Sequence, residues 1–189
     1  MSLNDAHRHL QQTLAAPWSL SQLQTWARFR QVFHQPANHA RALIKAFNDT
    51  DTVLFNGMLY HRVQLSWQPH LKPRHVVAGT DNPRMEDGQP ATRVRIDLDA
   101  AELLWSENAF IWGTLVHEML HAYLIISTNN SDRETCRCGK KGDHGPQFYA
   151  SVQALVRRLH LEGLEGEDLV HKSDCCCVER GGRKAHGFA

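Results

Sequence analysis

Two histidines and a glutamate interrupt the most apolar stretch of the chain, residues 109–126 (AFIWGTLVHEMLHAYLII). The stretch contains no proline and is long enough to predict a buried helix. On a helix, His117 and His121 stand one turn apart on the same face, with Cα atoms about 6 Å apart, so both imidazoles can converge on one Zn²⁺. Glu118 could then reach a water on that metal rather than the metal itself. The H-E-x-x-H pattern therefore indicates metal-assisted hydrolysis with Glu118 as the general base.

The alternative is a pair of core histidines that bond to the backbone, with Glu118 at the edge of the helix. Burying three ionisable groups in one turn of an apolar helix costs several kcal/mol unless something pairs with them. A metal ion supplies that partner, so we favour the metal site.

A catalytic zinc takes three protein ligands and leaves one position for water, so a third ligand should follow His121. The metzincin continuation of the motif is excluded, because Leu124 and Ser127 occupy its glycine and histidine positions. His144 is the favoured ligand, since it precedes a helix predicted to start at Pro146 whose apolar face would hold the imidazole near the core. The carboxylates of Glu134, Asp143 and Glu162 are alternatives.

The elements that must position these residues give an α+β pattern. Helices are predicted at residues 3–14, 20–35, 37–47, 100–105 and 109–126, and from residue 146 onward. Short β-prone segments at residues 59–67, 74–78 and 92–98 predict a small antiparallel sheet. Residues 1–37 are predicted to form an N-terminal helical region, residues 38–162 the main domain, and residues 163–189 a flexible, cysteine-containing tail.

Composition limits the function classes. A chain of 189 residues with 42% hydrophobic and 22% charged residues suits one soluble globular domain with tails. The net charge of +1 argues against a wholly basic nucleic-acid-coating domain, although residues 1–48 hold five Arg/Lys against the single Asp5. That excess predicts either a basic face or an ordinary solvated helix surface. The chain shows neither a secretory signal nor an uninterrupted membrane span, which predicts a nuclear or cytoplasmic protein that is not secreted and has no membrane partner.

Two motifs of the chain, one after the other, resemble those of a known protein family. Residues 117–123 (HEMLHAY) followed by residues 144–148 (HGPQF) are similar to the core of the SprT-like zinc metalloproteases, the group that includes the Spartan DNA–protein crosslink proteases. Looser similarity at residues 54–57, 63–67, 78–79 and 95–98 extends the resemblance over residues 38–162.

The resemblance implies a zincin-like metalloprotease domain in which His117, His121 and His144 bind one catalytic Zn²⁺ and Glu118 activates the water. It implies a zinc-dependent endopeptidase that cleaves DNA-associated or DNA-crosslinked proteins, with a protein substrate and DNA as partners and DNA repair as its setting. The strand at residues 92–98 is the predicted partner of an extended substrate backbone, and Tyr123 is predicted to lie in the core. Two other functions remain open: a nucleic-acid-associated scaffolding module with structural zinc, and a zinc hydrolase of a non-peptide bond.

The five cysteines depart from the family's zinc ribbon, because they lack its CxxC spacing. Two cysteines, Cys136 and Cys138, lie in the loop between His121 and His144, and three more, Cys175, Cys176 and Cys177, lie in the tail. One hypothesis is that the loop cysteines meet those of the tail through a second, structural zinc ion or a disulfide. Five free thiols are the alternative in a reducing compartment.

Overall fold

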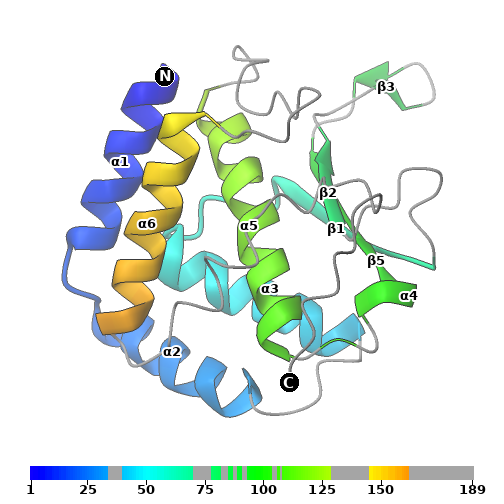
Figure 1. Cartoon of the computed structure of the whole chain (residues 1–189), viewed down its shortest axis with the longest axis horizontal. Helices are drawn as coiled ribbons and strands as arrows, with labels where there is room; N and C mark the ends of the chain where they lie inside the picture. The colour runs from blue at the N-terminus through cyan, green and yellow to red at the C-terminus, as the bar shows by residue number, and fades with distance from the viewer. Residues whose placement is uncertain are drawn as a thin grey trace, which may run out of the picture.

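A computed structural model describes residues 1–33, 40–69, 78–81, 85–86, 89–90, 93–103, 106, 108–128 and 145–161 (Figure 1). Its helices are α1 (Leu3–Ala15), α2 (Leu20–Phe33), α3 (Ala40–Leu54), α4 (Ala100–Leu103), α5 (Asn108–Ser127) and α6 (Pro146–Leu161). Its strands are β1 (Val63–Gln68), β2 (Ala78–Asp81), β3 (Met85–Glu86), β4 (Gln89–Pro90) and β5 (Val94–Asp99). The predicted α+β class is confirmed. The predicted region boundaries, at residues 37/38 and 162/163, fall outside the described residues.

The main sheet is mixed, so the prediction of an antiparallel sheet was wrong for one of its two pairings. The strand order is β1-β5-β2, with β1 parallel to β5 and β2 antiparallel to β5. A parallel pair needs a long connection, which residues 69–93 provide. The apolar side chains of β5 at Val94, Ile96 and Leu98 are buried, so this strand takes the central position with a partner on each side. β3 and β4 form a separate antiparallel pair.

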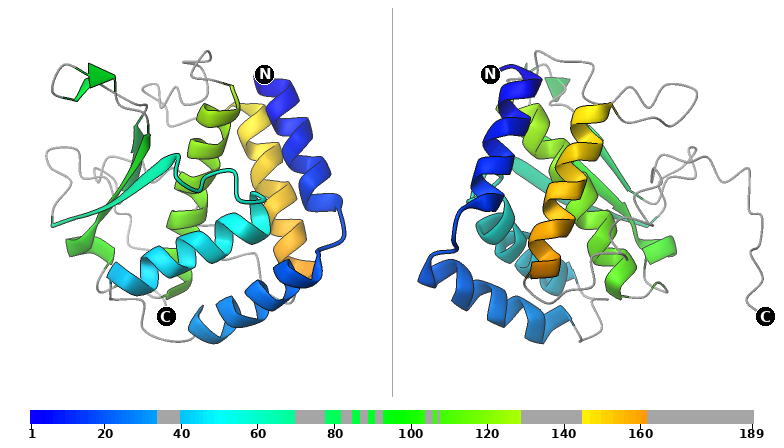
Figure 2. Two further views of the ribbon diagram at one scale, coloured as in Figure 1. Left: turned by 180° about the vertical axis from the view of Figure 1, so that it is seen from behind. Right: turned by 60° about the vertical axis from the view of Figure 1, so that its left-hand side comes forward.

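Helix α5 forms the centre of the molecule. It lies between the sheet on one side and the pair α1 and α6 on the other (Figures 1 and 2). Every residue from 111 to 125 is buried, as a helix with apolar residues on all sides requires. By length and composition alone, Phe110–Ser127 could cross a membrane, but 83% of this window is buried inside the protein, as in the core helix of a soluble protein.

Two histidines of α1 hydrogen-bond to the helices beside it. The Nδ1 atom of His7 lies 2.7 Å from Oγ of Ser151 on α6, and Nδ1 of His9 lies 2.8 Å from the hydroxyl oxygen of Tyr123 on α5. Burial lowers the pKa of His7, because it penalises the charged imidazolium. Tyr123 is buried, as predicted, and these contacts make α1 part of the packing around α5.

Helix α3 runs past its predicted end at residue 47 to Leu54, because the two aspartates that follow are buried and paired instead of solvated. Asp49 is buried and accepts a 2.7 Å hydrogen bond from the guanidinium of Arg28 on α2. Asp51 is also buried, and its Oδ1 accepts the backbone N–H of Leu59 at 3.0 Å. The carboxylates thus anchor α3 to α2 and to the turn before β1.

Asp51 should make the stability depend on pH. Burial raises its pKa from the ordinary 3.8 to about 6, while hydrogen bonds from the backbone of Leu59 and Tyr60 oppose the increase. Between these two pH values the folded protein binds more protons than the unfolded chain, so the free energy of unfolding falls as the pH rises through this window. The decrease amounts to about 3 kcal/mol at 1.36 kcal/mol per pKa unit.

Asp51→Asn keeps an oxygen acceptor for the Leu59 N–H and removes the charge. Urea unfolding at intervals from pH 4 to pH 7 should therefore show the variant gaining up to about 3 kcal/mol on the wild type as the pH rises. Parallel profiles for the two proteins would contradict the assignment. Asp5→Asn on the exposed first turn of α1 is a control of opposite sign, because a hydrogen bond from the Ser2 side chain lowers the pKa of Asp5, so this variant should not gain stability on the wild type as the pH rises.

Candidate functional site

His117 and His121 face each other one turn apart on α5. Their Nε2 atoms lie 3.1 Å apart, and their ring centroids are 4.8 Å apart with an angle of 72° between the planes. Both side chains are buried, with 6% and 3% exposed. Helical spacing alone brings the rings to one face, and burial of α5 removes them from bulk water.

Phe148 of α6 holds the two imidazoles from the other side. Its ring stacks on His121 with centroids 4.3 Å apart and meets His117 edge-on at 5.0 Å. Phe148 is itself buried, so the two rings it contacts have little room to turn. The sequence predicted that the apolar face of this helix lies near the core, but not this contact. The place of Phe148 at the end of the HGPQF motif, beside a proposed ligand, was the available signal.

Glu118 contacts the sheet. Its side chain is 1% exposed, and Oε2 accepts a 2.5 Å hydrogen bond from the hydroxyl of Thr80 on β2. The same hydroxyl lies 3.1 Å from the backbone carbonyl oxygen of Glu118. Sequence reasoning missed Thr80, because no local pattern links a threonine on a strand to a glutamate 38 residues later.

The strand predicted to pair with a substrate was wrongly chosen. Strand β5 already pairs with β1 on one edge, from Val94 to Asp99, and with β2 on the other, from Arg95 to Leu98. Its backbone therefore has no open edge for a third partner over the paired positions. In the described sheet, β2 is the edge strand that packs against α5.

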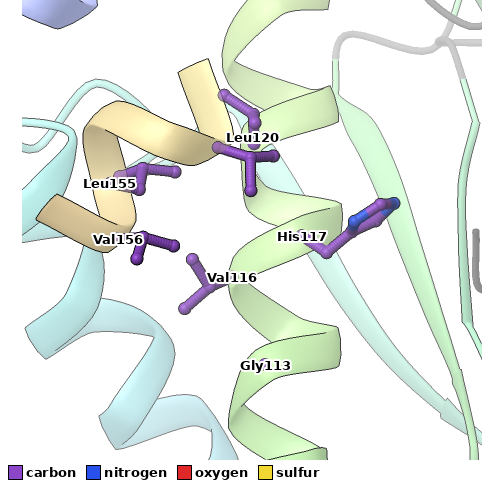
Figure 3. A pocket seen from close by; sticks show the side chains of 7 residues that line it. Gly113, Val116, His117, Leu120, Leu155 and Val156 are labelled. Atoms are coloured by element: carbon purple, nitrogen blue, oxygen red, sulfur yellow. The ribbon is translucent and has the colours of Figure 1, made fainter. Parts of the chain in front are cut away.

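An apolar groove separates α5 from α6 beside the histidines. Aliphatic side chains of both helices face it, and Figure 3 shows the imidazole of His117 pointing away from Val116, Leu155 and Val156. The groove is lined by Gly113, Val116, His117, Leu120, Val152, Leu155 and Val156. Apart from His117, the residues that line it have apolar side chains or none, so the groove offers van der Waals contact.

The donor set fits part of a zinc site. Two ligands at 2.0–2.1 Å from a tetrahedral zinc lie about 3.3 Å apart, close to the 3.1 Å between the Nε2 atoms. No group of three or more His, Cys, Asp or Glu gathers within the part of the chain that the structure describes. His144, the alternatives Glu134, Asp143 and Glu162, and all five cysteines lie outside that part. The described residues therefore include two of the three predicted ligands.

Comparison with protein families decides the classification. The model of the SprT-like family matches residues 43–164, more than half of the chain. The chain belongs to the SprT-like family. SprT-like domains are generally metalloprotease-like and typically bind zinc. No curated protein and no solved structure gives a significant match.

The SprT-like match places the site inside the family's domain. The matched segment begins within α3 and extends past the end of α6, so it includes β2, α5 and Phe148. Helices α1 and α2 precede the SprT-like segment, and α1 packs against its helices α5 and α6.

Proposed function

We propose that this protein is a zinc-dependent endopeptidase. The proposal rests mainly on one observation: the Nε2 atoms of the buried His117 and His121 lie 3.1 Å apart on α5, and the buried Glu118 directly follows His117. Membership of the SprT-like family supports it. A purely structural zinc site has no use for a carboxylate held beside its ligands, which favours a hydrolase over a scaffolding module.

The residues of the chain have distinct roles in this proposal. His117, His121 and His144 hold the zinc as neutral imidazoles, and Phe148 fixes the first two rings. When bound, zinc lowers the pKa of a water and polarises the scissile carbonyl. Glu118 takes the proton of the attacking water and passes it to the leaving amine.

The proposed substrates are DNA-associated or DNA-crosslinked proteins, and the proposed compartment is the nucleus or the cytoplasm. The support for DNA is the family resemblance, together with exposed cations on α2 and α3. Arg30 on α2 and both Arg41 and Lys45 on α3 are exposed. Phosphate contacts of such side chains weaken with added salt.

The test uses the full chain and a dye-labelled, unfolded basic protein as substrate. Metal analysis should find at least one zinc per chain, dialysis against a chelator should abolish cleavage, and added Zn²⁺ should restore it. Cleavage should rise when single-stranded DNA is added. Full activity in zinc-free protein would contradict the metal-dependent mechanism, while equal rates with and without DNA would contradict the proposed substrate class.

A further inference from the structure

We infer that Thr80 is a positioning residue that sets the orientation of the Glu118 carboxylate; this rests on the proposed function of Glu118. The contact joins two elements far apart in sequence, strand β2 and helix α5, which pack together. Its length of 2.5 Å lies in the range of a hydroxyl donating to a carboxylate, a bond about twice as strong as one between neutral groups.

The geometry of the hydroxyl favours the carboxylate as its acceptor. Thr80 has one hydroxyl proton and two oxygens of the same residue within reach, the carboxylate at 2.5 Å and the backbone carbonyl at 3.1 Å. The shorter, charge-assisted bond takes the proton. The second distance shows how closely the hydroxyl lies against the turn of α5 that carries Glu118.

Thr80 suits this role because its own side chain is held. A β-branched side chain on a strand has few χ1 rotamers, and β2 is fixed by its pairing with β5. The terminal torsion of a glutamate, in contrast, has a broad preference and needs an external contact to define it. Thr80 therefore defines the plane of the Glu118 carboxylate through the bond to Oε2.

Matched variants separate the role of the Thr80 hydroxyl in orienting Glu118 from the packing of the Thr80 side chain. Thr80→Val keeps the shape and strand preference and loses the hydroxyl, whereas Thr80→Ser keeps the hydroxyl and loses the methyl group. Thr52→Val is the control, because Thr52 is also partly buried and its hydroxyl donates to the backbone carbonyl of Asn48 within α3.

Steady-state cleavage of the labelled protein should show a split between the two kinetic constants. Thr80→Val should lower kcat by about 10-fold to 100-fold with KM within about 2-fold, the range seen when a supporting hydrogen bond is removed. Thr80→Ser should restore most of the rate, Thr52→Val should match the wild type, and all variants should bind zinc equally. A wild-type kcat in Thr80→Val, in a protein that Glu118→Gln inactivates, would overturn the inference and leave the proposed function standing.

A spectroscopic readout on zinc-free protein makes the test independent of activity. With glutamate labelled with ¹³C at Cδ, the signal missing from Glu118→Gln identifies the Glu118 carboxylate. That signal should shift in Thr80→Val and stay near its wild-type position in Thr80→Ser and Thr52→Val. An unmoved signal in Thr80→Val would overturn the inference even if the protein proves not to be a peptidase. Should Thr80→Val fail to fold, Thr80→Ala makes the same comparison with Thr80→Ser.

Discussion

Replacing Glu118 with glutamine should lower the rate of protein cleavage by about 1,000-fold and leave zinc bound, since general acid–base catalysis contributes about 100-fold to 10,000-fold. Glutamine has nearly the same shape as glutamate, and its amide oxygen still accepts the Thr80 hydroxyl at the buried position of Glu118. It cannot take a proton from water at neutral pH. The folded structure and the two histidines should therefore persist while the base is lost.

The measurement pairs metal analysis with initial rates of cleavage for the wild type and Glu118→Gln. Asp97→Asn is a matched control, because it makes the same carboxylate-to-amide change on β5, where Asp97 pairs with Arg95 at 2.8 Å. The control should cleave at close to the wild-type rate. Equal rates for the wild type and Glu118→Gln would refute the assignment of Glu118 as the base.

Replacing His121 with glutamine should weaken zinc binding by more than about 100-fold and abolish cleavage. Loss of a residue that merely supports a ligand costs about 10-fold to 100-fold in metal affinity, and the loss of a ligand should exceed that. The variant removes one of the two Nε2 atoms that meet at 3.1 Å, and leaves Phe148 with one imidazole to pack on.

Zinc affinity is measured by competition with a chromogenic chelator. His7→Gln is the control, since it replaces another partly buried histidine, one that bonds Ser151 between α1 and α6. It should retain wild-type affinity. A His121→Gln protein that binds zinc as tightly as the wild type would show that the metal is held elsewhere.

Local features of the fold were predictable where neighbouring residues decide them. A helix was predicted to start at residue 20, and α2 begins there after the reciprocal bonds of a capping box, Ser19 N–H to Gln22 Oε1 at 3.0 Å and Gln22 N–H to Ser19 Oγ at 3.2 Å. Helix α6 begins at Pro146 as predicted, because the first N–H groups of a helix have no acceptor within it, so the missing N–H of proline costs nothing there. The predicted end of α3 at residue 47 was wrong, because the pairing of Asp49 with Arg28 depends on a side chain from another helix.

The sequence by itself determined which residues of α5 could do chemistry. A spacing of four residues on a helix places His117 and His121 on one face whatever surrounds them, so their rings come within reach of each other. The apolar residues around them likewise determined that this helix would be buried.

Only the tertiary structure decided what surrounds Glu118 and the histidines. The parallel pairing of β1 with β5, the edge position of β2 and the contacts of Thr80 and Phe148 all join segments distant in sequence. Strand pairing depends on which strand best fills the centre of the sheet, a comparison among whole segments that no local periodicity encodes. The motif thus specified the proposed zinc ligands and base, while long-range packing specified the side chains that contact them.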